Sequence, residues 1–178
     1  MVHEVIIAGS GGQGAMLIGQ LLAYSGMLEQ KHVTWIPSYG PEMRGGTANC
    51  SVIVSQEPIG SPIVSEPTTL VSMNRPSLDK FEATLCPGGT LFVNSSLVDR
   101  PVLRDDIKTY LVPASDIAAE LGNARVANMV MFGAMIAATK MVDSASALGA
   151  LKKVFAGREH LLPVNESALR KGMAAGSP

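Results

Sequence analysis

Near its start the sequence passes from a short apolar run into a cluster of glycines. Residues 4–8 read Glu4-Val5-Ile6-Ile7-Ala8, and residues 9–14 read Gly9-Ser10-Gly11-Gly12-Gln13-Gly14. A continuous run rich in β-branched residues is typical of a strand buried on both faces. The glycine spacing matches a turn that leads from a strand into a helix and lets backbone N–H groups approach an anion. This stretch therefore predicts a strand, a glycine turn and the start of a helix.

The rest of the chain continues the alternation of strands and helices. Residues 13–28 predict a helix and residues 33–36 a second strand, so residues 4–36 form a βαβ unit. We expect further strands at 47–55, 70–74, 90–94 and 109–112, and helices at 77–85, 115–121, 124–141, 144–155 and 167–174. Ser115 is expected to cap the helix that ends at Leu121. The pattern predicts an α/β fold, a single three-layer Rossmann-like domain over residues 1–178 with a mostly parallel sheet.

The composition argues against nucleic acid as a partner. Of the 178 residues, 47% are hydrophobic but only 4% are aromatic, which favours layered packing over a surface that stacks bases. The formal net charge is −1, from 14 basic and 15 acidic residues, without a basic stripe. Only 16% of residues are charged, against about a quarter in ordinary domains. A surface so poor in charge favours burial by other subunits over the alternative of a hydrophobic monomer.

Metal binding, secretion and membrane insertion are not expected. The two cysteines, Cys50 and Cys86, are too few for a four-cysteine iron–sulfur cluster, and the three histidines have no zinc-ligand spacing. The first apolar run is too short for a signal peptide and has no basic leader. The longest apolar stretch, residues 129–139, is too short to cross a bilayer. We therefore expect a cytoplasmic protein.

The glycine turn has two interpretations from the residues alone. Gly11, Gly12 and Gly14 either face a ligand or only permit close packing of helix on strand. A turn that binds NAD requires an acidic residue near the end of the second strand, where this chain has Ile36-Pro37-Ser38-Tyr39 instead. NAD is therefore unsupported. Gln13 places an amide at the helix start, where it bonds either a ligand or a neighbouring loop.

A second candidate region follows the second predicted strand. Residues 39–46 read Tyr39-Gly40-Pro41-Glu42-Met43-Arg44-Gly45-Gly46. Loops that follow parallel strands gather at the carboxyl edge of the sheet, so Arg44, Gly45 and Gly46 are expected beside the glycine turn. The guanidinium of Arg44 suits a phosphate or a carboxylate, although an ion pair with Glu42 or with a partner chain is the alternative.

A third feature is Asn128, which lies early on the most apolar predicted helix. A buried Asn is costly unless it is hydrogen-bonded, so it either orients a loop or belongs to a helix cap. The sequence has no nucleophile–histidine set, paired carboxylates or thiamine-type motif. These residues predict a binding and structural component with no catalytic residue of its own.

Three segments together resemble a known family. They are G-S-G-G-Q-G at 9–14, P-S-Y-G-P-E-M-R-G-G-T-A-N-C-S-V at 37–52 and N-x-x-x-x-N-M-V-M-F-G-A at 123–134. In order and spacing they resemble the gamma subunit of 2-oxoacid:ferredoxin oxidoreductases. The residues of these segments resemble the 2-oxoglutarate branch of the family more than the pyruvate branch. The related indolepyruvate oxidoreductases share much of the same pattern.

The resemblance implies a place in a larger enzyme. Such complexes convert a 2-oxoacid and coenzyme A into an acyl-CoA and CO2 while they reduce ferredoxin. Thiamine diphosphate, Mg²⁺ and the [4Fe–4S] clusters belong to alpha, beta and delta partners, and the gamma component packs against them. In some relatives it helps to hold coenzyme A, although this chain alone is expected to bind no cofactor. The rival class is a freestanding nucleotide-binding module that uses the glycine turn.

By this resemblance, one set of residues forms an edge for coenzyme A or for a neighbouring subunit. The set comprises the glycine turn and the segment after the second strand: Gly11, Gly12, Gln13, Gly14, Arg44, Gly45 and Gly46. None of them is expected to be catalytic, and none to bind a metal.

Overall fold

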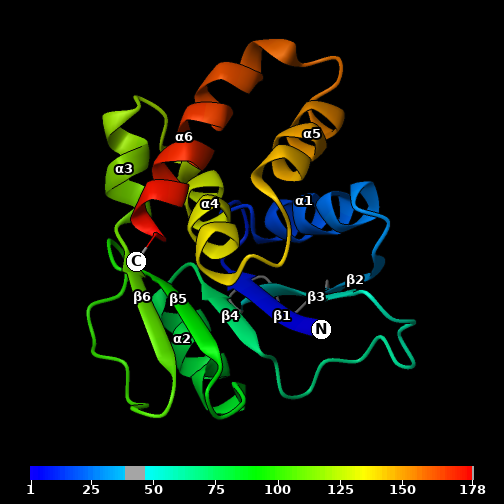
Figure 1. Ribbon diagram of the computed structural model, residues 1–178. Coiled ribbons are helices and arrows are strands. Elements are labelled where there is room, and N and C mark those ends of the chain that lie inside the picture. The colour runs from blue at the N-terminus through cyan, green and yellow to red at the C-terminus, as the bar shows by residue number, and fades with distance from the viewer. Residues whose placement is uncertain (39–46, 178) are drawn as a thin grey trace.

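A computed structural model describes residues 1–38 and 47–177 and shows an α/β fold built on one six-stranded sheet (Figure 1). The strands are β1 (Val2–Gly9), β2 (His32–Ser38), β3 (Ala48–Ser55), β4 (Thr69–Ser72), β5 (Thr90–Asn94) and β6 (Lys108–Val112). Their order in the sheet is β2-β3-β1-β4-β5-β6. β3 runs antiparallel to β1 and β2, whereas β1, β4, β5 and β6 pair in parallel. The predicted α/β class and mostly parallel sheet are confirmed.

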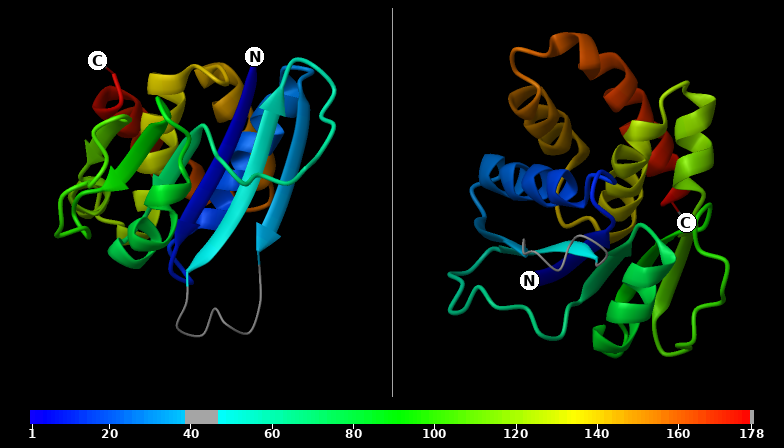
Figure 2. Two further views of the ribbon diagram at one scale, coloured as in Figure 1. Left: turned by 90° about the horizontal axis from the view of Figure 1, so that it is seen from below. Right: turned by 180° about the vertical axis from the view of Figure 1, so that it is seen from behind.

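Helices cover the two faces of the sheet unequally (Figures 1 and 2). The helices are α1 (Ala15–Leu28), α2 (Arg75–Phe81), α3 (Ala114–Glu120), α4 (Ala127–Thr139), α5 (Ser144–Val154) and α6 (Leu162–Ala175). Within the described ranges, three short 3₁₀ turns accompany them: η2 (Glu82–Thr84), η3 (Ala124–Val126) and η4 (Glu159–Leu161). α2 lies on one face and the other five helices on the opposite face, so the sheet is the middle of three layers.

The larger of two apolar clusters joins the sheet to the five-helix face. Alternate residues of β3 point into this cluster, as the sequence pattern predicts: Cys50, Val52 and Val54 are buried there with Val5 and Ile7 of β1. α4 is the central helix, and its residues from Ala127 to Ala137 are all buried. A helix that is apolar all round must be covered on every side, and here the sheet, α3 and α6 cover it.

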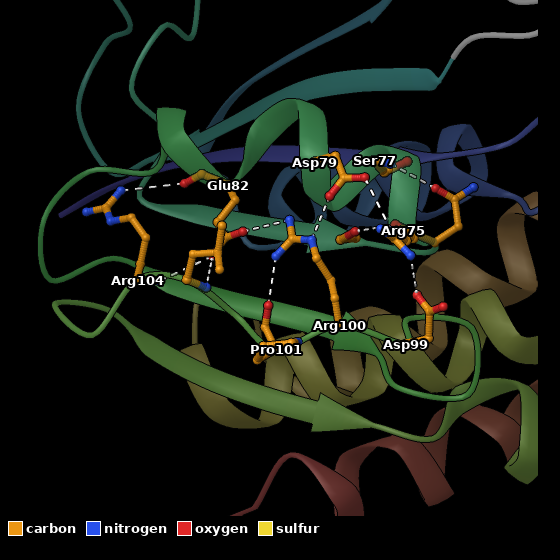
Figure 3. A network of polar contacts seen from close by, with 11 residues as sticks. Arg75, Ser77, Asp79, Glu82, Asp99, Arg100, Pro101 and Arg104 are labelled. Atoms are coloured by element: carbon orange, nitrogen blue, oxygen red, sulfur yellow. Dashed lines mark hydrogen bonds and ion pairs between the residues drawn. The ribbon is translucent and has the colours of Figure 1, made fainter.

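The smaller cluster lies under α2 and is closed by a charged segment, residues 95–107 (Figure 3). Glu82 is only 4% exposed, and its carboxylate accepts hydrogen bonds from the N–H groups of Leu103, at 2.5 Å, and Arg104. The guanidinium of Arg100 lies 2.8 Å from Glu82 and 2.6 Å from Asp79. Because these contacts join α2 and η2 to the loop before β6, they hold the third layer onto the sheet.

Several helix starts differ from the sequence expectation; α4, for example, begins at Ala127 rather than at residue 124, because residues 124–126 form η3. α1 begins at Ala15 rather than at residue 13, because Gly14 adopts a left-handed conformation as its N-cap. The prediction that Ser115 caps α3 is wrong, since Pro113 is the N-cap and Ser115 lies inside the first turn. α6 begins at Leu162 rather than at residue 167, since Pro163 is tolerated in a first helical turn.

Candidate functional site at the carboxyl edge of the sheet

The glycine turn lies where the connections of neighbouring strands diverge. β1 leads through α1, on the five-helix face, to β2, whereas β4 leads through α2, on the opposite face, to β5. β1 and β4 are adjacent and parallel, so their carboxyl ends form a topological switch point. Open α/β sheets bind their ligands in the crevice outside such a point.

The turn itself is open toward solvent. Gly12 has φ +85° and Gly14 has φ +77°, a backbone conformation that residues other than glycine rarely adopt. Gly11 and Gly12 are exposed, and a Cβ atom placed on either would meet no other atom within 4 Å. The backbone of Gly11 and Gly12 is therefore accessible to a ligand, as the ligand-facing interpretation requires.

The side chain of Gln13 holds the turn rather than projecting from it. Its Oε1 accepts a hydrogen bond from the N–H of Ser10 at 2.7 Å and another from Nδ2 of Asn74 at 2.8 Å. The same Nδ2 of Asn74 donates to Oγ of Ser10 at 2.6 Å, while Oδ1 accepts from the N–H of Ser77 and caps α2. Asn74 thus joins the turn after β1 to the helix after β4.

Asn128 approaches the turn from the other side. Its Nδ2 donates to the carbonyl oxygen of Gly14 at 3.5 Å, and its Oδ1 accepts from the N–H of Met129 at 2.9 Å. A Cβ atom at position 14 would lie 2.3 Å from that Nδ2. Gly14 is therefore required both by its conformation and by the closeness of α4. Asn128 contacts the glycine turn, as the first of its two interpretations requires, and it also accepts a bond from an N–H at the start of α4, as the second requires.

A hollow of about 240 Å³ opens beside the turn. Its wall includes Gly12 and Gln13 from the turn, Met73 and Asn94 from the ends of β4 and β5, and Ser115 and Arg125 from α3 and η3. The buried amide of Asn94 is fixed, since its Nδ2 donates to the carbonyl oxygen of Met73 at 3.3 Å and to Oγ of Ser115 at 3.0 Å. The carboxyl ends of three strands therefore meet in one wall, which contains both polar and apolar groups.

The structure brings together some of the predicted site residues. Gly11, Gly12, Gln13 and Gly14 form the turn, whereas Arg44, Gly45 and Gly46 lie outside the described residues. The strand ends that flank them lie at the same edge, since Gly9 pairs with Ala48 and Ser38 pairs with Asn49.

Three residues of the site were missed from the sequence. Asn74 precedes Arg75-Pro76, a helix-start signal that could have revealed its capping role. Asn94 ends a predicted strand, and Arg125 lies directly before the buried helix, but neither position carries a signal of its own. Their proximity depends on the strand order, which local sequence does not encode.

The described residues contain no group of three or more His, Cys, Asp or Glu side chains that could hold a metal ion. Cys50 is fully buried against α1, and burial raises the pKa of its thiol to about 11. Such a thiol is protonated at neutral pH and therefore unsuited to ligate a metal or to attack a substrate. Over residues 1–38 and 47–177, no helix has the length and apolar character needed to cross a membrane.

Comparison with known proteins identifies similar chains. The family model described as pyruvate ferredoxin/flavodoxin oxidoreductase matches residues 4–175. Ketoisovalerate oxidoreductase subunit VorA of Methanothermobacter thermautotrophicus is 41% identical over 170 residues, which are 95% of this chain but only 35% of VorA. 2-Oxoglutarate synthase subunit KorC of Methanocaldococcus jannaschii is 36% identical over 149 residues, which are 82% of this chain and 80% of KorC. The chain thus spans about a third of the first relative and most of the second.

Solved structures have the same fold. The gamma subunit of a keto/oxoacid ferredoxin oxidoreductase from Geobacter sulfurreducens superposes with a TM-score of 0.85 at 29% identity, over 98% of both chains. The 2-oxoglutarate:ferredoxin oxidoreductase of Magnetococcus marinus, solved with 2-oxoglutarate, coenzyme A and succinyl-CoA bound, superposes with a TM-score of 0.89 at 22% identity. That match covers 98% of this chain and 31% of the other.

Proposed function

We propose, on the premise that the chain belongs to the pyruvate ferredoxin/flavodoxin oxidoreductase family, that it is the gamma subunit of a 2-oxoacid:ferredoxin oxidoreductase. The assembled enzyme would convert a 2-oxoacid, coenzyme A and oxidised ferredoxin into an acyl-CoA, CO2 and reduced ferredoxin. The observation that supports this role most directly is the likeness, over nearly the whole of both chains, to a solved gamma subunit.

The partners proposed for this chain are alpha, beta and delta subunits, which would carry thiamine diphosphate, Mg²⁺ and the [4Fe–4S] clusters. When bound there, thiamine diphosphate supplies the chemistry that stabilises the carbanion left by decarboxylation. The two cysteines of this chain cannot provide the four thiolates of a cluster, which agrees with clusters held elsewhere. Ferredoxin would meet the assembled complex rather than this chain alone.

The contribution proposed for this chain is to bind and orient coenzyme A at the carboxyl edge, or to meet a neighbouring subunit there. The residues of this edge are Gly11, Gly12, Gln13, Gly14, Arg44, Gly45 and Gly46. The exposed backbone of Gly11 and Gly12 beside the hollow supports a ligand contact. Gln13 would act through its bonds to Ser10 and Asn74, which keep the turn in one conformation.

The substrate proposed for the complex is 2-oxoglutarate, with succinyl-CoA as the product. The relatives named for 2-oxoglutarate resemble this chain in length, since the match covers 80% of one KorC and 86% of another. The branched-chain 2-oxoacid ketoisovalerate is the second candidate, because VorA is more similar in sequence at 41% identity.

Steady-state kinetics of the complex purified with its co-expressed partners tests both the gamma-subunit role and the choice of substrate. We expect ferredoxin reduction to require this chain, and kcat/KM to be higher for 2-oxoglutarate than for ketoisovalerate or pyruvate. A preference for ketoisovalerate would replace the substrate but keep the gamma-subunit role. A chain that remains alone when partners are co-expressed, and binds a nucleotide as a monomer, would instead identify a freestanding module.

A further inference from the structure

A second pocket lies at the amino edge of the sheet, on the five-helix face and away from the glycine turn. Its volume is about 230 Å³. Its wall includes His3 from β1, Val54 and Ser55 from β3, Lys31 from the turn before β2 and Lys140 from the end of α4. The label N in Figure 1 marks this end of β1. The proposed function uses none of the residues of this amino-edge pocket.

The wall of the amino-edge pocket is basic. The side chains of His3, Lys31 and Lys140 can carry positive charge, and no Asp or Glu is among the described residues that line it. Lys31 is neutralised in part, since its Nζ lies 2.7 Å from Oε2 of Glu29. The one hydrogen bond of Lys140 within residues 1–38 and 47–177 is donated by its backbone N–H to the carbonyl oxygen of Ile136. The exposed ammonium of Lys140 is therefore available to a ligand.

The helix ends at this edge oppose an anion less than their dipoles alone would. Both α1 and α4 end here, and free carbonyl groups at a helix end carry partial negative charge. At the end of α1, the N–H of Lys31 donates to the carbonyl oxygen of Gly26, and the N–H of Gln30 donates to that of Met27, both at 3.0 Å. The carbonyl oxygen of Met141, in the pocket wall, accepts from Nζ of Lys31 at 2.8 Å. These carbonyl groups therefore already have donors.

The backbone of Lys140 is strained for a lysine. Lys140 is the C-cap of α4 and has φ +56°, a left-handed conformation in which a Cβ atom is sterically unfavourable and glycine is the usual residue. Among the described residues, Gln30 at φ +58° is the other non-glycine residue with a positive φ. A strained residue whose charged side chain lines a pocket indicates a role for that side chain.

His3 makes the charge of the pocket depend on pH. The pKa of its half-buried imidazole lies below the ordinary value, first because burial disfavours the charged form, and also because Lys31 and the amino group of Met1 lie nearby. The other charged groups around it are Lys140 in the same wall and Glu29, which is bonded to Lys31. The imidazole is therefore neutral at pH 7 without a counterion, whereas a neighbouring anion would raise its pKa and favour proton uptake.

We propose that the amino-edge pocket binds a small, doubly charged oxyanion, either free phosphate or the phosphate group of a small ester, between His3, Lys31 and Lys140. The charges balance, because the pair of Lys31 and Glu29 is neutral while Lys140 and a protonated His3 supply two positive charges. The volume is below the roughly 300–1,000 Å³ of pockets for drug-sized ligands, which favours a small ion over a nucleotide. This site does not depend on the proposed function.

Calorimetry of the purified complex with sulfate tests this assignment, because sulfate stays doubly charged while the pH is changed. At constant ionic strength, sulfate should bind ~10-fold more tightly at about pH 5.5 than at about pH 8, since the anion raises the pKa of His3 and binding then takes up a proton. His3→Gln keeps a polar side chain that cannot be protonated. It should therefore bind sulfate with the same affinity at both pH values.

Lys140→Gly separates the charge of the side chain from the strain of its backbone. Glycine suits a φ of +56°, so the Tm of the complex should not fall, whereas sulfate should bind ~10-fold more weakly because an ammonium is lost. Gln30→Gly is the matched control, since it relieves the same kind of strain, removes no cation and lies outside the pocket wall. It should leave both the Tm and the sulfate affinity undiminished.

Several results would overturn the site. They are wild-type sulfate affinity in Lys140→Gly, an equal loss in Gln30→Gly, a pH dependence that persists in His3→Gln, or no saturable binding to the wild-type complex. Inorganic phosphate and glycerol 3-phosphate at pH 8 distinguish the two sources of the anion: tighter binding of the ester would assign the pocket to a phosphate ester, and tighter binding of phosphate to the free ion. The KM for coenzyme A should not change in Lys140→Gly, which keeps this test separate from the proposed function.

Discussion

At the scale of single residues, Asn74 has more than one structural task. One side-chain amide caps α2 and donates to both Ser10 and Gln13. Because Asn74 is 8% exposed, water cannot easily replace these partners. The position therefore couples the conformation of the glycine turn to the start of the helix on the other face of the sheet.

We expect Asn74→Ala to lower the free energy of unfolding by about 2 kcal/mol, of which the lost cap and the lost buried hydrogen bonds contribute roughly half each. Asn74→Asp is the matched variant, because a carboxylate still accepts from the N–H of Ser77 but cannot donate to Ser10 or Gln13. It should recover about 1 kcal/mol. Urea unfolding measures both variants, and equal losses for Ala and Asp would contradict the division between cap and turn.

Cys50 makes the free energy of unfolding depend on pH in alkaline solution. Burial raises the pKa of its thiol from 9.0 to about 11, and hydrogen bonds from Trp35 and the backbone of Gly19 reduce this effect only in part. The folded state therefore holds the thiol proton at pH values where the unfolded state loses it. The stabilisation is complete below pH 9 and is lost as the pH rises from 9 to 11.

We expect this linkage to remove up to about 3 kcal/mol of unfolding free energy across that interval. Lysines and tyrosines also titrate there, so the measured quantity is the difference in slope between the wild type and Cys50→Ala. The Ala variant should be less stable at neutral pH but should lose less on going from pH 9 to 11. Parallel curves for the two proteins would show that the thiol does not contribute.

At the scale of elements, α4 and α6 pack closely against each other. A Cβ atom on Gly172 would lie 2.0 Å from the carbonyl oxygen of Val130, and one on Gly133 would lie 2.1 Å from that of Leu169. Such distances involve backbone atoms, which cannot move aside as a side-chain end does. The two helices therefore pack directly through their glycines, and this contact sets how closely α6 covers α4.

Gly172→Ala separates packing from helix propensity, because the two effects have opposite signs. Propensity alone would stabilise α6 by about 1 kcal/mol, whereas the clash with Val130 should destabilise the protein by about 3 kcal/mol. Gly149→Ala in α5 is the control, since its Cβ would meet only the Cδ1 atom of Leu28 at 3.1 Å. Thermal unfolding should show a large loss for the first variant and little change for the second; similar stabilities would refute the close contact.

The elements differ in how far the sequence could predict them. β1 and the glycine turn could be predicted from neighbouring residues alone, because a run of apolar residues indicates the strand and the spacing of the glycines indicates the turn. The start of α6 was placed too late because Pro163 and Asn165 interrupt the apolar period. The cap at Ser115 was wrong because α3 begins one residue earlier, at Ala114, and the hydroxyl of Ser115 accepts from Asn94 instead. Arg125 could not be assigned to the hollow, since only the packing of α4 beside α1 and β5 brings it there.

At the scale of the whole molecule, the two edges of the sheet each carry an open glycine turn, but the hollow lined by Gly12 lies at only one of them. The carboxyl edge joins the glycine turn, the ends of β4 and β5, and the hollow. The amino edge carries another glycine with a similar conformation, Gly88, which precedes β5, has φ +75° and also has open space around it. The same substitution at Gly12 and at Gly88 therefore imposes similar backbone strain at the two ends of one sheet.

This pairing gives a test of the ligand edge in the assembled complex. Coenzyme A at about 100 times its Kd should stabilise the complex that contains the wild-type chain by about 2.7 kcal/mol, which raises its Tm. Gly12→Asp should abolish the rise, because its carboxylate would repel the phosphates of coenzyme A. Gly88→Asp should lower the starting Tm similarly but keep the ligand-induced rise, since it lies at the opposite edge. Thermal unfolding with and without coenzyme A measures all three proteins. An equal rise in the two variants would place the ligand away from the turn, and the absence of any rise in the wild type would contradict coenzyme A binding by the complex.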